Sequence, residues 1–301
     1  MRWPLWALTV IAAGRLCAAP APLLHAPLDG AMQATWALGE PLTPACSMTG
    51  PFLDGVRGQA RQLGGRNTAT YYLDEGFLPP EGTCSLWVKP LDWTPGASDH
   101  FVFFTSFDYA AAEGGYVRVI LYKLHDGTDL TLLIQNSIGG EKASLIKAPI
   151  EFWQKGQWHH LAFTWDADRY RLYVDGAAVG DAATVALPET GRWEIMVGTP
   201  YSSWIHIGSE TNAIDEFTLW SAALDAEEIK RMHDEIAPNL PPPVQPEAAA
   251  TAPGRENLAL RRNGAFMLAS SFRDYEASYP DNLGDGDAAS FWRPHGVDMP
   301  Q

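Results

Sequence analysis

The segment 156–180, GQWHHLAFTWDADRYRLYVDGAAVG, contains adjacent histidines and nearby aspartates, residue types that could bind a metal or act in catalysis. Neighbouring side chains of a β-strand point to opposite faces, so His159 and His160 cannot both bind one metal ion without a bulge. Asp175-Gly176 is a strong signal for a two-residue hairpin. We therefore predict a β-meander in which the histidines pack or hydrogen-bond as scaffold.

No nucleophile or metalloprotease motif accompanies these histidines. The sequence contains no G-x-S-x-G, no H-E-x-x-H and no glycine-rich phosphate loop. Those arrangements expose a serine nucleophile, hold zinc and cradle phosphate, respectively. The segment therefore favours a binding module over an enzyme.

The composition excludes some classes of partner. The chain has 301 residues, of which 46% are hydrophobic, and a formal net charge of -15. This charge repels phosphate backbones and anionic membrane surfaces, and so disfavours nucleic acid as a partner. Neutral sugars and divalent cations are compatible with it.

Residues 23–237 are predicted to be all-β with a short C-terminal helix. Short runs rich in Val, Leu, Thr and aromatic residues alternate with turn sequences such as PPEG, TPGASD, HDGTD and IGGE. Many short strands at this spacing predict an antiparallel β-sandwich or jelly roll. The main helical pattern is SAALDAEEIKRMHDEI, which Ser221 or Asp225 can cap.

Residues 1–18 have the features of a secretory signal peptide. One Arg near the start is followed by an apolar run from Leu5 to Ala13 and then by small residues. That run is too short to span a bilayer, and no later segment is long and apolar enough, so we expect no membrane insertion. We expect a protein secreted to the extracellular space or the periplasm.

Two cysteines remain once Cys17 leaves with the signal peptide. Cys46 and Cys84 form an even pair, and an oxidising compartment favours a disulfide between them. Two unrelated buried thiols are the alternative.

A linker and a further segment follow the all-β region. Residues 238–256 are rich in Pro and Ala without periodicity, which predicts an extended linker. Residues 257–301 again have a domain-like composition, but so few residues rarely form a core alone. Either the sequence is a fragment, or this segment docks elsewhere.

Four segments resemble, in sequence order, the laminin-G-like (concanavalin A-like lectin/glucanase) domains of secreted bacterial proteins. They are GPFLDGVRGQARQLGG, GTCSLWVKPLDW, QWHHLAFTWDADRYRLYVDG and NAIDEFTLWSAALDAEEIKRMHDE. The resemblance covers most of residues 23–237 and implies a concanavalin A-like sandwich. This fold hosts both lectins and glycoside hydrolases, so it does not decide the function.

The hydrolase alternative can be tested on the sequence. Retaining glycosidases need two carboxylates about 5–5.5 Å apart, and the resemblance to laminarinase-type members implies acids at i, i+2 and i+4 of one strand. The nearest pairs are Asp166/Asp168, Asp225/Glu227 and Asp285/Asp287, and none has a third acid in step. We therefore expect no catalytic residue in this chain.

The tail resembles the first third of a discoidin-type (coagulation factor C-type) galactose-binding domain. The matching segment is NLALRRNGAFMLASSFRDYEASYPDNLGDGDAASFW, although Arg261 stands where that family has Gly. The resemblance implies an incomplete second β-domain over residues 257–301 and no particular binding site.

Two aspartates are candidates for a structural calcium site. The first and last strands of a jelly roll usually lie side by side, so Asp29 and Asp215 are expected to approach each other. The resemblance implies a calcium ion held by Asp215, with Asp29 as its partner. If no calcium binds, Asp215 is instead expected to accept hydrogen bonds from backbone N–H groups at the end of its strand.

Aromatic residues in predicted loops are candidates for a sugar platform. Sugar rings stack their apolar C–H faces on exposed aromatic rings, and such sites occur in loops at a sandwich rim. The candidates are Tyr201, Trp204, Trp193, Arg192 and Tyr109. The alternative is that these side chains cover the edges of the core.

The sequence as a whole predicts a secreted, non-catalytic carbohydrate-recognition or adhesion module. Its expected partner is a glycan or an extracellular glycoprotein. An extracellular scaffold that presents other domains is one alternative. A polysaccharide-degrading enzyme, or an appendage of one, is the other.

Overall fold

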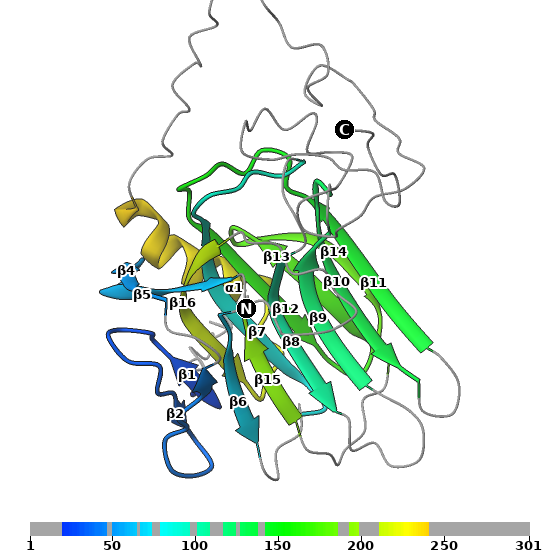
Figure 1. Ribbon diagram of the computed structural model, residues 1–301. Coiled ribbons are helices and arrows are strands. Elements are labelled where there is room, and N and C mark those ends of the chain that lie inside the picture. The colour runs from blue at the N-terminus through cyan, green and yellow to red at the C-terminus, as the bar shows by residue number, and fades with distance from the viewer. Residues whose placement is uncertain are drawn as a thin grey trace, which may run out of the picture.

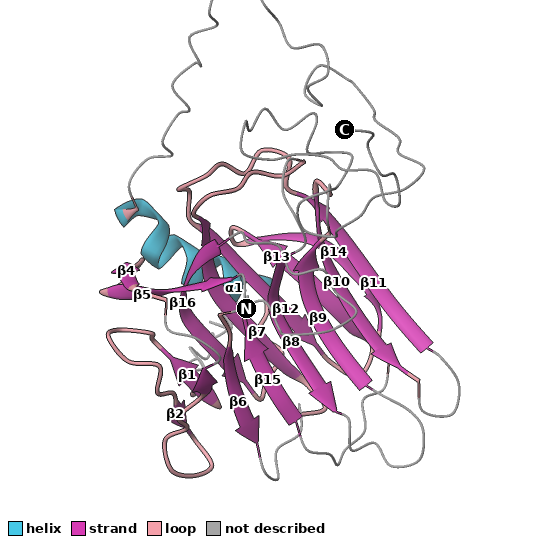
Figure 2. Ribbon diagram, in the orientation of Figure 1, coloured by secondary structure: helices cyan, strands magenta, loops and turns pink. Residues whose placement is uncertain are grey.

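The described residues fold into two facing antiparallel β-sheets with one α-helix on the outer side of one sheet (Figures 1 and 2). The predicted all-β sandwich with a short C-terminal helix is confirmed. The computed structural model describes residues 20–46, 50–64, 67–73, 79–96, 101–108, 117–124, 127–137, 142–185, 193–198 and 211–240.

The nine-stranded sheet has the spatial order β14-β13-β12-β7-β16-β1-β2, and β5, which carries β4, also pairs with β16. The bounds are β1 Leu24–Ala26, β2 Thr35–Trp36, β4 Phe52–Asp54, β5 Gln59–Gly64, β7 Gly82–Pro90, β12 His159–Trp165, β13 Arg169–Val174, β14 Ala177–Ala183 and β16 Thr211–Trp220. As expected, the first and last of these strands are neighbours, with Leu24 opposite Leu219.

The seven-stranded sheet has the spatial order β11-β10-β9-β8-β15-β6-β3. The bounds are β3 Ala45–Cys46, β6 Ala69–Leu73, β8 Phe101–Asp108, β9 Val117–Lys123, β10 Asp129–Asn136, β11 Lys142–Pro149 and β15 Trp193–Val197. The central strands pair over long stretches, so this sheet forms a continuous second layer.

The main core lies between the two sheets. Alternate residues of each strand point inward, as period-two patterning requires. Phe104 on β8 makes ring contacts with Phe163 on β12 and Phe217 on β16, at centroid distances of 5.4 and 6.1 Å. These aromatic side chains join the layers and are fully buried.

The β12–β13 meander has the predicted geometry. Leu161, Phe163 and Trp165 enter the main core, whereas Ala162 lies in a separate cluster on the outer face. Asp175 and Gly176 both have positive φ, 50° and 75°, and connect β13 to β14 as a two-residue hairpin.

The helix α1, Ala226–Ile236, covers the outer face of the nine-stranded sheet and continues into a 3₁₀ turn, Ala237–Asn239. Asp225 begins it with a capping box, because its side chain accepts from the Glu228 N–H while the Glu228 carboxylate accepts from the Asp225 N–H. Ile229 and Ile236 lie two turns apart and are buried against the sheet. The helix thereby creates a second, outer layer of packing.

The predicted disulfide is not present in the structure. Cys84 is a free, fully buried thiol on β7, in the middle of the nine-stranded sheet. Cys46 lies on β3, at the edge of the other sheet, and its side chain is not part of the structure that is described. Burial raises the pKa of Cys84 well above its ordinary value, so its thiol stays protonated and unreactive.

Three predicted segments lie outside the described residues: the signal peptide 1–18, the linker beyond residue 240 and the discoidin-like segment 257–301. Within the described residues, no helix has the length and apolarity needed to cross a membrane.

Candidate functional site

Polar side chains gather on the outer face of the nine-stranded sheet, beneath α1. Alternation along β7 points Ser85 and Trp87 outward, and His160 on β12 lies directly opposite Trp87 in the register. Trp87 contacts the His160 ring at 5.0 Å and stacks on His233 of α1 at 5.7 Å. The helix therefore closes over a layer that mixes aromatic and polar groups.

Ser85 and His160 form a buried hydrogen-bonded pair. Ser85 Oγ and His160 Nε2 are 2.8 Å apart, and both residues are at most 2% exposed. His160 Nδ1 is buried without a hydrogen-bond partner. Burial first, and then the charge of His233, lower the pKa of His160 to about 3, although Asp175 opposes this shift. The imidazole is therefore neutral at physiological pH and a weak base.

The other histidine is held by the hairpin. His159 Nδ1 is 2.9 Å from Asp175 Oδ2, and the His160 N–H donates to Asp175 Oδ1, also at 2.9 Å. Burial raises the pKa of Asp175, but its hydrogen bond with His159 and the charge of that residue bring it below its ordinary value overall. His159 also stacks on Trp153 at 4.1 Å. Hydrogen bonds and ring contacts thus hold both histidines within the fold, as the sequence predicts.

A cluster of charged groups lies beside this layer. Glu216 Oε2 is 3.4 Å from His25 Nε2 and 3.7 Å from Arg57 Nη1, and Arg57 Nη2 also donates to Glu235 on α1. Glu216 has a positive φ of 50° at a bulge in β16. The bulge lets Asp215 and Glu216 reach different neighbours, which is a common role for bulges near binding sites.

These two groups of residues line a pocket of about 240 Å³ between α1 and the sheet. Its sheet wall includes Ser85, Trp87, His160, Glu216, Thr218 and Trp220, and its helix wall includes Met232, Glu235 and Ile236. The remaining lining residues are Pro22, His25 and Arg57. The pocket therefore combines indole rings with hydroxyl, imidazole and charged groups.

Asp29 and Asp215 both contact the loop between β4 and β5. Asp215 Oδ2 accepts from the N–H groups of Val56 and Arg57, at 2.8 and 3.3 Å, and its Oδ1 accepts from the Glu216 N–H. Asp29 accepts from the Gln59 N–H at the other end of that loop. The two aspartates thus contact opposite ends of the same loop, and their approach to each other stays a prediction.

The atoms around Asp215 suit an anchored carboxylate rather than calcium. Calcium takes six to eight oxygen ligands, whereas three N–H groups surround this carboxylate. Among the described residues, no group of three or more His, Cys, Asp or Glu is arranged to hold a metal ion. Burial raises the pKa of Asp215 to about 7, although the hydrogen bonds from Arg57 and Val56 lower it. Calcium stays a prediction that this donor set does not favour.

The sequence-predicted sugar platform is not brought together by the described residues. Tyr109, Arg192, Tyr201 and Trp204 lie outside them. Trp193 begins β15 opposite Leu73 of β6, but its side chain is also outside the description. The platform therefore stays a prediction.

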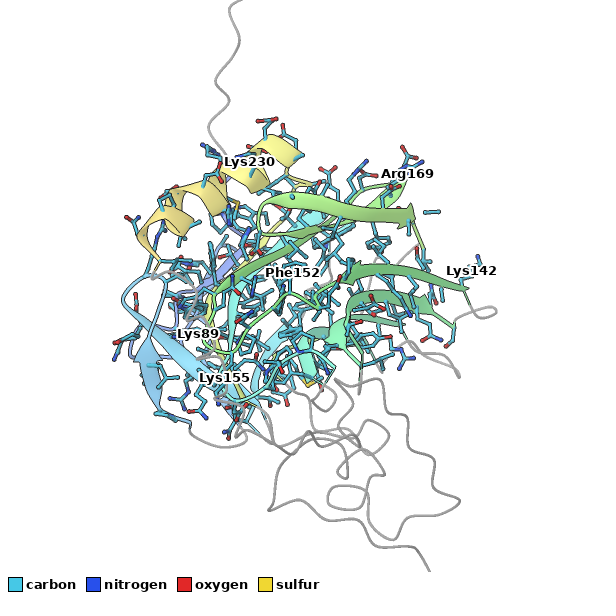
Figure 3. All side chains as sticks on the ribbon, turned by 90° about the horizontal axis from the view of Figure 1, so that it is seen from above. Lys89, Lys142, Phe152, Lys155, Arg169 and Lys230 are labelled. Atoms are coloured by element: carbon cyan, nitrogen blue, oxygen red, sulfur yellow. The ribbon has the colours of Figure 1, made fainter. Side chains whose placement is uncertain are left out.

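Positive charge is distributed around the described part of the molecule. In Figure 3, Lys230 lies on α1. Arg169 and Lys142 lie on strands at one side of the view, and Lys89 and Lys155 lie at the other side. Lys89 stacks over the Trp158 ring at 4.6 Å, which ties its ammonium group to the surface. Such scattered cations differ from the basic stripe typical of nucleic-acid interfaces.

Sequence reasoning missed the pocket beneath α1. Trp87 lies in a strand and is only 2% exposed, yet it lines this pocket. The outward alternation of Ser85 and Trp87 was a usable signal. The β16 bulge and the position of α1 were not readable from the sequence.

The two antiparallel sheets, with a helix following the last strand, define a jelly-roll sandwich of the lectin and glucanase class. The chain belongs to the concanavalin A-like lectin/glucanases superfamily, which residues 65–230 match. Comparison with curated proteins gives no match.

Several solved structures share the fold. The ligand-binding domain of botulinum neurotoxin serotype D, in complex with N-acetylneuraminic acid, has 11% identity and a TM-score of 0.51, covering 71% of this chain and 50% of that one. The binding domain of Paraclostridial Mosquitocidal Protein 1 has 12% identity and a TM-score of 0.50, covering 67% and 49%. The chain thus spans about half the length of these toxin domains.

A shorter relative matches over almost its whole length. Domain 4 of an extracellular arabinanase from Geobacillus stearothermophilus, in complex with arabinotriose, has 18% identity and a TM-score of 0.49, covering 71% of this chain and 98% of that one. At these identities the likenesses to the toxin domains show the fold alone.

Proposed function

We propose that the protein is an exported carbohydrate-recognition module that binds glycans without cleaving them. The superfamily to which the chain belongs includes lectins and glucanases, so binding and hydrolysis of glycans are the two candidates to weigh first. The choice between the two depends on the carboxylates, because glycoside hydrolysis requires two of them facing one sugar bond.

The single observation that carries the proposal is that the carboxylates around the pocket are already engaged. Glu216 and Glu235 are both paired with Arg57, so each carboxylate is engaged in an ion pair rather than left to serve as acid or base. Asp215 accepts three backbone hydrogen bonds, and Asp175 holds the two histidines. These groups stabilise the fold and suit binding rather than hydrolysis.

The ligands of structures with the same fold support the choice of a glycan. One neurotoxin binding domain was solved with N-acetylneuraminic acid, and another with SialylT. We propose the same broad class of ligand for this protein, with Tyr201 and Trp204 as aromatic contacts at the rim. Export follows from the signal-peptide features of residues 1–18.

Glycan-array and polysaccharide pull-down experiments with the full chain test this function. We expect binding that falls at least tenfold in Tyr201→Ala and Trp204→Ala, without a change in melting temperature. Phe152→Ala is the matched control, because Phe152 is an exposed aromatic residue of another loop. It should bind normally.

Other outcomes of these experiments would favour the hydrolase or the scaffold function. Release of reducing ends from a polysaccharide would overturn the non-catalytic function. The absence of binding across glycan classes would overturn the recognition function and leave an extracellular scaffold.

A further inference from the structure

We propose that the pocket between α1 and the outer face of the nine-stranded sheet binds the terminal monosaccharide of a neutral glycan. This inference rests on the proposed function and assigns it a site, separate from the predicted rim platform. The site is formed by Ser85, His160, Glu216, Trp87 and Trp220.

The size of the pocket suits one sugar ring. Its volume of about 240 Å³ equals that of roughly eight liquid waters, and lies below the ~300–1,000 Å³ typical of drug-sized ligands. Ser85, Trp87 and His160 are 1–2% exposed, whereas the side chains of Arg57 and Glu235 are 48% and 66% exposed. The sheet side of the pocket is therefore closed and its charged side is open, which suits a chain end.

An unpartnered polar atom belongs to the buried wall. His160 lines the pocket, and its Nδ1 has no hydrogen-bond partner. A buried polar atom without a partner costs free energy. A sugar hydroxyl both donates and accepts, so it can pair with a neutral imidazole in either tautomer. The Ser85 hydroxyl, 2.8 Å from Nε2, fixes the ring orientation.

The apolar wall suits the C–H face of a sugar. The indole of Trp220 lies on the sheet side, together with Trp87, whose ring packs on His160 and His233. Met232 and Ile236 lie on the helix side. Aromatic rings beside convergent polar groups are the usual composition of small-ligand sites. An ordinary apolar ligand would leave the Ser85–His160 pair unused.

The charges favour a neutral sugar over an acidic one. Two carboxylates, Glu216 and Glu235, share the single guanidinium of Arg57. A third carboxylate from a sialic or uronic acid would experience net repulsion there. Free lone pairs of Glu216 can instead accept hydrogen bonds from hydroxyl groups.

Isothermal titration with the full chain tests the site. The probes are methyl glycosides of glucose, galactose and mannose, with N-acetylneuraminic acid as the acidic comparison. We expect at least one neutral glycoside to bind, and Ser85→Ala and Glu216→Gln each to weaken it about tenfold, equivalent to about 1.4 kcal/mol. Ser144→Ala is the matched control, since Ser144 is a buried serine that donates to the Ala183 carbonyl away from the pocket.

A second variant keeps the test decisive if a buried substitution fails to fold. Met232→Trp changes a partly exposed helix residue and should block the pocket while α1 still packs. Retained monosaccharide affinity in Met232→Trp would overturn the assignment, as would equal affinity of Ser85→Ala and Ser144→Ala. Preferential binding of the acidic sugar would overturn the neutral class.

The glycan array with the full chain tests the pocket assignment separately from the proposed glycan-recognition function. If the full chain binds glycans but the pocket variants bind them as wild type does, the pocket assignment fails and the recognition function stands. If the chain binds no glycan at all, both fail.

Discussion

At the scale of single residues, several buried polar groups of this sandwich are held by specific partners. Asp215 anchors the β4–β5 loop through N–H groups, Asp175 fixes the paired histidines, and Ser85 orients His160. Burying such groups without partners would destabilise the fold. Their titration therefore links stability to pH in predictable directions.

The first prediction concerns His160. Its pKa is about 3 in the folded chain and near 6.5 when unfolded, so between these values only the unfolded state binds the proton. The free energy of unfolding should therefore fall as the pH decreases from 6.5 toward 3, by up to ~1.4 kcal/mol per pH unit from this residue.

Urea unfolding of wild type and His160→Gln over pH 4–8 measures this effect. The stability advantage of wild type over the variant should be largest near pH 8 and shrink with acid. His25→Gln, which changes a partly exposed histidine, is the control. A pH-independent difference between wild type and His160→Gln would contradict the prediction.

The second prediction concerns Gly58 in the β4–β5 loop. A Cβ there would come 2.1 Å from Asp29 Oδ1, at a φ of +50°. Gly58→Ala should therefore displace the Asp29 contact and lower the unfolding free energy by more than ~2 kcal/mol, since the positive φ alone costs ~1–2.

Gly156→Ala separates the contact from the backbone strain. Gly156 also has a positive φ, of +80°, but a Cβ there meets nothing within 4 Å. Chemical denaturation should show a clearly smaller loss for Gly156→Ala. Equal losses in the two variants would mean that strain alone acts at Gly58.

At the scale of elements, α1 turns one face of the sandwich into a covered surface. The Asp175-Gly176 hairpin passes under it, and a Cβ on Gly176 would come 3.0 Å from the Cβ of His233. Trp87 and His233 stack where the helix crosses the sheet. The pocket exists only because this helix packs on the outer face.

The third prediction concerns the start of α1. Asp225→Ala removes the cap that accepts from the Glu228 N–H, which typically costs ~1 kcal/mol. Because the helix forms one wall of the pocket, glycoside affinity should also fall. Thermal melting and titration of the same preparation check both effects.

Arg231→Ala, an exposed change within the same helix, should affect neither quantity beyond ~0.5 kcal/mol. If Asp225→Ala behaves like this control, the capping box contributes nothing measurable.

At the scale of the whole molecule, aromatic side chains join the two sheets. Phe104 of the seven-stranded sheet contacts Phe163 and Phe217 of the other. Because interiors are close-packed, removing one such ring leaves a cavity that its neighbours fill only in part.

The fourth prediction concerns this junction. Phe104→Ala should lower the unfolding free energy by about 3–5 kcal/mol, measured by urea denaturation. Phe152→Ala, which removes a half-exposed ring, should cost under ~1 kcal/mol. A small loss in Phe104→Ala would mean that the sheets are not held together by this contact.

The sequence alone predicted the sandwich, the Asp175-Gly176 hairpin, the helix with Ser221 or Asp225 as its cap, and the hydrogen bonding and packing of both histidines within the fold. Each of these depends on local alternation, turn chemistry or capping, which act over a few residues. The proposed disulfide was wrong for the structure, because spacing does not reveal that Cys84 lies in a central strand and Cys46 at the edge of the other sheet.

Only the tertiary structure decided which outward-facing residues meet. Ser85, His160, Glu216 and Met232 are distant in sequence, and they share a pocket because β7, β12 and β16 are neighbours and α1 folds back over them. Long-range packing determines the order of the strands, the bulge at Glu216 and the placement of the helix. No local pattern in the sequence encodes these features.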